Sequence, residues 1–107
     1  MKRGDLVTVV SSGDYGKPRP ALIVQGDLYA EHPSLTVLPL TSDLYDMPSI
    51  RVTVEPDWDR ELRLRSHVMV DKATTIPRAE AGSRIGRLDE ATLASVGRAL
   101  AAFLGVD

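Results

Sequence analysis

Short runs of apolar and β-branched residues alternate with polar turns along most of this chain, a pattern that predicts an antiparallel β protein. We expect strands at 5–10, 20–25, 35–40, 50–54 and 67–71, and a shorter one near 84–86. Ile50, Val52 and Val54 alternate strictly and are predicted to share one face, while Val68 and Val70 are predicted to point inward. The first two runs flank a loop of turn-forming residues and are expected to form a hairpin.

Proline and capping residues mark where the predicted elements end. Pro39 is expected to end the strand at 35–40. One helix is predicted over 89–104, with Asp89 as its N-cap and Gly105 at its end. Its apolar face, expected to pack on the sheet, comprises Leu93, Val96, Leu100, Phe103 and Leu104. Five or six strands and one terminal helix predict a mostly β fold with a C-terminal helix, either a small antiparallel barrel or a half-open sheet.

Length and composition narrow the class of protein. The 107 residues suffice for a single domain, over 1–107, with one modest core. The absence of cysteine excludes disulfides, thiolate metal sites and a cysteine nucleophile. The N-terminus lacks the apolar segment of a signal peptide, and no apolar run approaches the length of a membrane span. We therefore expect a soluble, cytoplasmic protein.

The charge is unevenly distributed along the chain. The net charge of −2 argues, taken globally, against a nucleic-acid binder, because such domains are usually basic. However, residues 63–87 carry six bases and two acids, whereas residues 43–62 carry six acids and two bases. This asymmetry allows a basic groove on an acidic protein, although runs of charge are more often solvated faces.

The segment Lys17-Pro18-Arg19-Pro20 places a cation directly before a predicted buried strand. Pro18 disfavours the helical region for Lys17, Pro20 does the same for Arg19, and each proline has a fixed φ. A guanidinium held in this way suits a phosphate. The alternative is a surface turn in which Arg19 forms an ordinary ion pair, since the guanidinium fork suits carboxylates equally well.

Further polar residues follow two other predicted strands. Thr41 and Ser42 come after the strand at 35–40, and Asp71 and Lys72 end the strand at 67–71. Each pair has a simple structural explanation, because Thr41-Ser42 could be a turn and Asp71-Lys72 a surface ion pair. Strand ends can converge in a small barrel, however, and would then bring a cation, hydroxyls and a carboxylate into one cleft.

Such a cleft would suit cleavage of a phosphodiester bond in RNA. The carboxylate could accept the proton of the 2′-hydroxyl, Arg19 could stabilise charge on the phosphate, and a hydroxyl could orient a phosphate oxygen. Because the 2′-hydroxyl already lies beside its phosphate, this reaction can proceed without a metal. The two histidines lack the spaced partners of a metal site, and no phosphate-binding glycine motif is present, so we expect no metal and no cofactor.

Two aromatic residues lie in predicted loops. Tyr15 stands between glycines and Trp58 among acidic residues. Either ring could stack on a base, or could pack on the protein itself.

Several segments, in order, resemble the MazF/PemK (Kid) family of toxin endoribonucleases over nearly the whole chain. They are Lys2-Arg3-Gly4-Asp5-Leu6-Val7, Arg19-Pro20-Ala21-Leu22-Ile23-Val24, Pro39-Leu40-Thr41-Ser42, Ser66-His67-Val68-Met69-Val70-Asp71 and Ile85-Gly86-Arg87-Leu88. The resemblance implies an SH3-like barrel of the CcdB/PemK type and a two-fold homodimer. It also implies metal-independent cleavage of single-stranded RNA to a 2′,3′-cyclic phosphate, and a cognate antitoxin supplied in trans as an acidic segment.

The resemblance also implies the catalytic residues, namely Arg19, Thr41 and Asp71. The residues expected to contact RNA beside them are Tyr15, Lys17, Ser42 and Lys72. Some family members have an arginine where this chain has Met69, which cannot act as a general acid, so Arg19 or Lys72 would have to take that role. Two alternatives remain at this point: a CcdB-like gyrase poison without nuclease activity, and a non-catalytic RNA-binding module of the same fold.

Overall fold

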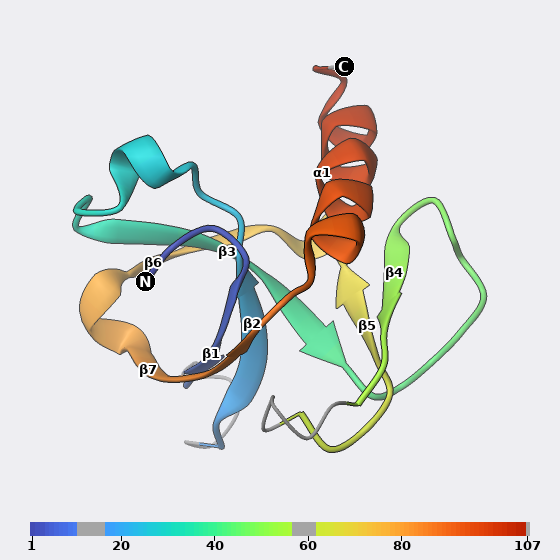
Figure 1. Ribbon diagram of the computed structural model, residues 1–107, viewed down its shortest axis with the longest axis horizontal. Coiled ribbons are helices and arrows are strands. Elements are labelled where there is room, and N and C mark those ends of the chain that lie inside the picture. The colour runs from blue at the N-terminus through green and yellow to red at the C-terminus, as the bar shows by residue number, and fades with distance from the viewer. Residues whose placement is uncertain (11–16, 57–61, 107) are drawn as a thin grey trace.

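Strands with alternating apolar residues build most of this molecule, whose computed structural model describes residues 1–10, 17–56 and 62–106. The strands are β1 (Asp5–Val9), β2 (Arg19–Ile23), β3 (Ser34–Thr41), β4 (Arg51–Val54), β5 (Ser66–Met69), β6 (Thr74–Pro77) and β7 (Ala81–Arg87). Three short 3₁₀ helices, η2 (Asp27–Tyr29), η3 (Val70–Lys72) and η4 (Arg78–Glu80), join them, and α1 (Glu90–Leu104) follows (Figure 1).

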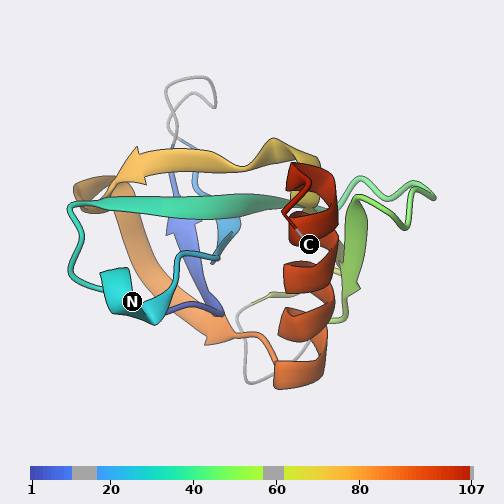
Figure 2. The same ribbon diagram turned by 90° about the horizontal axis from the view of Figure 1, so that it is seen from above.

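The strands form one seven-stranded antiparallel sheet within the described residues. Its order is β4-β5-β3-β2-β1-β7, and β6 pairs with the first half of β3 while β5 pairs with its last two residues. The predicted mostly β fold with a C-terminal helix is confirmed, and the sheet of the described residues is not closed, which corresponds to the half-open alternative. In this arrangement β3 is the central strand, and both β2 and β5 lie beside it (Figures 1 and 2).

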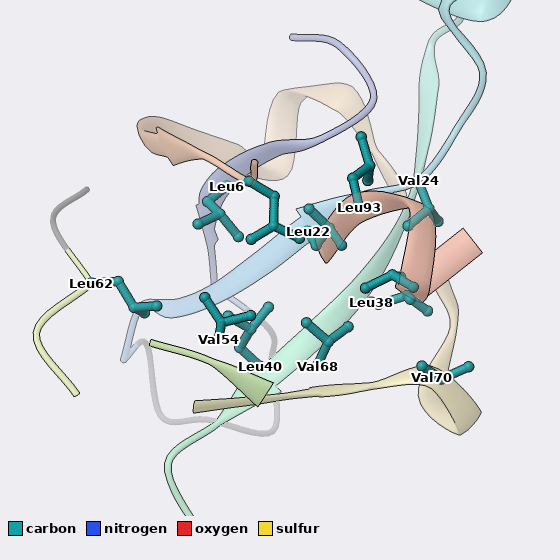
Figure 3. Close-up of a cluster of buried hydrophobic side chains, with 12 residues drawn as sticks. Leu6, Leu22, Val24, Leu38, Leu40, Val54, Leu62, Val68, Val70 and Leu93 are labelled. Atoms are coloured by element: carbon teal, nitrogen blue, oxygen red, sulfur yellow. The ribbon is translucent and has the colours of Figure 1, made fainter. Parts of the chain in front are cut away.

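Strands β1 to β3 bury apolar side chains on both of their faces. One cluster lies on the face that α1 covers (Figure 3) and comprises Leu6, Leu22, Val24, Leu38, Leu40, Val54, Leu62, Val68, Val70, Leu88, Leu93 and Val96. The second, smaller cluster lies on the opposite face and comprises Val7, Ala21, Ile23, Leu35, Val37 and Ile76. The predicted inward positions of Val68 and Val70 are confirmed.

The helix α1 begins and ends where the sequence predicts. The Asp89 carboxylate accepts a hydrogen bond from the Thr92 amide at 3.0 Å, and Gly105 adopts the left-handed conformation, with φ of 73°. Its predicted core face is only partly right, because Phe103 is 50 % exposed and Leu104 is exposed too. The last turn of α1 projects beyond the sheet, which explains why these two side chains are exposed (Figure 1).

Three strand predictions require correction. Pro39 does not end β3, which continues to Thr41. One edge of β3 pairs with β6 as far as Val37 and with β5 from Leu40 onward. Pro39 lies in the gap between these two partner strands, so the N–H that proline lacks is not needed for a ladder hydrogen bond there. Strand β5 ends at Met69, and the residues after it form η3 instead. Strand β6 was not predicted, because its sequence of two threonines, isoleucine and proline is short and barely alternates.

Candidate catalytic cavity

A cavity of about 330 Å³ opens where β2 begins and β3 ends. Two of the predicted site residues, Arg19 and Thr41, line it together. Antiparallel pairing explains why: Ala21 pairs with Pro39, and continuing this register by two residues brings Arg19 opposite Thr41 on the same face. The other lining residues are Val9, Pro20, Ala21, Val37, Pro39, Leu40, Met69, Thr74 and Ile76.

Arg19 supplies the cation of this cavity. It is the first residue of β2, where it pairs with Val9 of β1, and its side chain is exposed. The prolines on either side hold the backbone in the extended conformation that the ladder requires. A guanidinium beside largely apolar walls is less screened than one on an open surface, so its attraction for a phosphate is strengthened there.

Thr41 supplies a hydroxyl with a defined orientation. Its Oγ1 accepts a hydrogen bond from the amide of Asp43 at 3.0 Å, which is the turn that the simpler explanation of this segment predicted. Thr41 can serve the turn and the cavity at the same time, because a hydroxyl that accepts a hydrogen bond can still donate its own hydrogen. The side chain is therefore fixed by the turn and can offer that hydrogen to an oxygen atom in the cavity.

Asp71 is not brought into the cavity lining. It lies within η3, two residues after Met69, rather than at the end of a strand. Its Oδ2 is 3.4 Å from Lys72 Nζ, so the predicted ion pair of these neighbours is present. Its Oδ1 is buried and has no hydrogen-bond partner among the described residues, and the side chain is 19 % exposed. Among the described residues, Asp71 thus has an unsatisfied acceptor two positions after Met69 of the cavity wall, but is not itself part of that wall.

The position of Met69 in the cavity wall bears on the reaction. Its side chain is apolar and cannot transfer a proton, as the sequence indicates. Thr74, for which the sequence carries no signal, also lines the cavity, but its hydroxyl already donates to the Lys72 carbonyl at 3.0 Å. Among the described residues, Arg19 is the cation in the cavity wall, and Lys72 is an exposed cation beside Asp71.

The residues predicted to contact RNA lie at the rim of this region or outside the described chain. Lys17 and Ser42 are exposed and flank the two strand ends that form the cavity. Lys72 is exposed and is held near Asp71. Tyr15 and Trp58 lie outside the described residues.

Most of the basic residues between 63 and 87 are engaged within the protein. Arg78 donates to the carbonyls of His32, at 2.8 Å, and Ala30. Arg65 pairs with Glu55, whose carboxylate raises the pKa of that guanidinium. The positive balance of this segment does not by itself make a basic groove.

Two further arginines of this segment, Arg84 and Arg87, converge on a buried carboxylate. Asp5 is 4 % exposed, and its Oδ1 lies 3.2 Å from Arg84 Nε and 3.1 Å from Arg87 Nη1. Burial alone raises the pKa of Asp5, but the Lys2 amide and the two guanidinium groups outweigh burial and lower it below its usual value. These contacts tie the start of β1 to β7 and so have a structural role.

A second pocket, of about 320 Å³, was not predicted at all. Arg51 is only 8 % exposed, and its Cζ lies 4.1 Å from the centre of the Tyr45 ring. We call this the Arg51 pocket, and its lining residues are Leu44, Tyr45, Asp46, Met47, Pro48, Arg51, Thr53 and His67. Nothing in the sequence signals it, because Tyr45 belongs to a loop whose path depends on the tertiary fold.

No group of three histidine, aspartate or glutamate side chains in the described residues is arranged to hold a metal ion. The helices of the described chain include none that is both long and apolar enough to cross a membrane.

Comparison with known proteins gives consistent matches over almost the full chain. The family described as "PemK-like, MazF-like toxin of type II toxin-antitoxin system" matches residues 2–104. A "Probable endoribonuclease MazF" of Mycolicibacterium smegmatis is 43 % identical over 107 residues, which cover 99 % of this chain and 98 % of that protein.

Solved structures show the same similarity in three dimensions. An endoribonuclease from a mycobacterial species, in complex with its cognate antitoxin, superposes with a TM-score of 0.83 at 25 % identity, over 100 % of this chain and 97 % of the other. MazF in a MazE–MazF complex from Deinococcus radiodurans, at 24 % identity, has the same fold, with a TM-score of 0.80 over 100 % of this chain and 97 % of the other.

Proposed function

This chain belongs to the PemK-like, MazF-like toxin family of type II toxin–antitoxin systems, and we propose that it cleaves single-stranded RNA without a metal ion. The observation that carries this proposal is that Arg19 and Thr41 line one cavity. A cation and a hydrogen-bond donor facing the same space are what a phosphate in a negatively charged transition state requires.

In the proposed reaction the 2′-oxygen of the RNA attacks the adjacent phosphorus and the bond from phosphorus to the 5′-oxygen breaks. The products are a 2′,3′-cyclic phosphate and a 5′-hydroxyl. Arg19 stabilises the negative charge on the phosphate, and Thr41 donates a hydrogen bond to a non-bridging oxygen. The proton of the 2′-hydroxyl passes to Asp71, and Lys72 or Arg19 protonates the leaving 5′-oxygen.

The role of Asp71 requires a small movement. Its carboxylate lies outside the cavity wall, two residues beyond Met69, and one of its oxygens has no hydrogen-bond partner in residues 1–10, 17–56 and 62–106. Rotation of this side chain toward bound RNA would satisfy that oxygen and place it beside the 2′-hydroxyl. Catalytic hydrogen bonds often become short only when substrate is present, so this position is compatible with a general base.

The partners follow from the family. A structural neighbour is an endoribonuclease bound to its cognate antitoxin, and we propose that an acidic antitoxin segment binds this chain and blocks RNA. We also propose a two-fold homodimer that acts in the cytoplasm. An exposed apolar patch supports the homodimer, because an isolated chain would leave it in water; it comprises Phe103 and Leu104 at the end of α1 and Val106 after it.

The test is to incubate the purified protein with a mixed pool of single-stranded RNA and to map the ends of the fragments. We expect 2′,3′-cyclic phosphate and 5′-hydroxyl ends, unchanged cleavage in EDTA, and no cleavage of DNA of the same sequences, which lacks the 2′-hydroxyl. Fragments with 5′-phosphate ends, or activity that EDTA abolishes and a divalent ion restores, would contradict the mechanism. Intact RNA together with trapping of gyrase on DNA would favour the gyrase poison instead.

A further inference from the structure

The Arg51 pocket lies on the same face of the sheet as the catalytic cavity. Thr41 of β3 pairs with His67 of β5, which pairs with Thr53 of β4. Met69 pairs with Arg51 in the next row. Since paired residues point to the same side of a sheet, these side chains form one continuous surface across β3, β5 and β4, strands that lie side by side in Figure 1.

Arg51 is a buried cation without a carboxylate partner among the described residues. Its Nη2 donates to the Tyr45 hydroxyl, and its Nε is buried without any hydrogen-bond partner. Asp46 lines the same pocket but forms no ion pair with Arg51. Withdrawing a guanidinium from water without pairing it is unfavourable, so this site is prepared for an anion.

The other groups of the pocket suit a nucleotide. The Nδ1 of His67 is buried in the same pocket as Arg51 and has no partner in the described part of the chain, and Thr53 is an exposed residue that carries a hydroxyl. Tyr45 is half-exposed, so the face of its ring that is turned away from Arg51 can receive a base. A nucleotide could therefore place its phosphate on the Arg51 guanidinium and stack its base on the Tyr45 ring.

We propose that the Arg51 pocket binds a second phosphate of the same single-stranded RNA, with the neighbouring base stacked on Tyr45. This inference rests on the proposed function, because it assigns the pocket to the substrate of that cavity. Thr41 and Thr53 are separated by two strand spacings, roughly 10 Å, so the second phosphate belongs to a nucleotide near the scissile one and not to a distant part of the RNA.

The test measures binding of a fluorescent, mixed-sequence 2′-O-methyl RNA, which lacks the free 2′-hydroxyl and is therefore not cleaved. The variants are Arg51→Met and Tyr45→Ala, with Arg98→Gln as the matched control, because Arg98 is an exposed arginine on α1, which covers the other face of the sheet. We expect Arg51→Met to weaken binding about tenfold to a hundredfold. The slope of log affinity against log salt should fall by about 0.7 for the lost phosphate contact.

Two further measurements separate this role from a structural one. Arg51→Met removes an unpaired buried charge, so its melting temperature should not fall, and Tyr45→Ala, which changes a loop residue, should weaken binding without changing the salt slope. A loss of stability in Arg51→Met with unchanged RNA binding in both variants would overturn the proposal. Arg51→Met that binds RNA normally but loses affinity for poly-glutamate would also overturn it and would assign the pocket to an acidic protein segment.

The catalytic cavity provides the comparison that keeps the two proposals apart. If Arg19→Ala weakens RNA binding and Arg51→Met does not, the second phosphate site is wrong and the proposed function stands. If neither variant changes RNA binding, the proposed function itself fails.

Discussion

Arg19 and Thr41 come opposite each other on neighbouring strands and line one cavity, although neither belongs to a motif that contains the other. The register of β2 and β3 creates this relationship. Because Ala21 pairs with Pro39, continuing the same register by two residues brings Arg19 opposite Thr41. The turn after Thr41 and the prolines around Arg19 then reduce the freedom of both residues before any substrate binds.

Arg19→Ala should lower the rate of RNA cleavage by about 10²–10³ or more, because it removes the cation that stabilises the transition state. The fold should be retained, since the side chain is exposed. Single-turnover cleavage rates and circular dichroism measure the two effects. Lys17→Ala is the control, as an exposed cation in the same segment, and should mainly weaken RNA binding. Cleavage by Arg19→Ala at the normal rate would remove Arg19 from the site.

Thr41→Val and Thr41→Ser form a matched pair. Valine keeps the shape of threonine but removes the hydroxyl, so cleavage should slow by about tenfold to a hundredfold, the value of a hydrogen bond to a charged group. The lost contact with the Asp43 amide should also reduce the free energy of unfolding by about 1 kcal/mol. Serine keeps both functions and should behave like the unaltered protein. Equal cleavage rates for the two variants would show that the hydroxyl only stabilises the turn.

Asp71→Asn should lower kcat much more than it raises KM, because a general base acts in the chemical step while an amide of the same size preserves binding. The control is Lys72→Met, which removes the cation that lies 3.4 Å from this carboxylate. If Lys72 protonates the leaving oxygen, its variant should lower kcat as well. Equal effects of Asp71→Asn on kcat and KM would make Asp71 a residue that binds RNA.

The sequence predicts the fold where the cause is local. Alternation, the Asp89 cap and the glycine at 105 depend on neighbouring residues, and the strands and helix that they indicate are present. The sequence does not predict how far the sheet extends beneath a helix, and therefore Phe103 was assigned to the core. The order of strands and the position of β6 depend on contacts distant in sequence, which periodicity does not contain.

In the candidate site, too, the sequence predicts what depends on local residues and not what depends on distant contacts. Residue types at strand ends identify Arg19 and Thr41, and the register of the sheet brings them together. The alternation of Val68 and Val70 predicts a strand that ends at Asp71, yet β5 ends at Met69, and Asp71 lies in η3, outside the cavity lining. Alternation predicts that Val52 and Val54 share one face, but it does not reveal that Arg51 is buried beside Tyr45 of a loop.

Phe103→Glu should convert the proposed homodimer to a monomer. The side chain is exposed at the apolar end of α1, so a charge there would lie in the interface but would not disturb the core. Light scattering coupled to gel filtration gives the mass. Leu28→Glu is the control, since Leu28 is an exposed leucine on η2, and it should leave the mass unchanged. A single-chain mass for the unaltered protein would contradict the homodimer itself.

Asp5→Asn should destabilise the fold in a pH-dependent way. The amide cannot pair with Arg84 and Arg87, so at pH 7 the free energy of unfolding should fall by about 2 kcal/mol. Because the pKa of Asp5 is lowered in the folded state, its contribution is complete above the unfolded-state value of about 3.9 and is lost as the pH falls further through the folded value. Urea denaturation at pH 7 and pH 3 should therefore show that the difference in free energy of unfolding between the unaltered protein and Asp5→Asn is smaller at pH 3 than at pH 7. Asp46→Asn, which alters an exposed carboxylate, should show no such change, and a difference for Asp5→Asn that grows in acid would reverse the assigned sign.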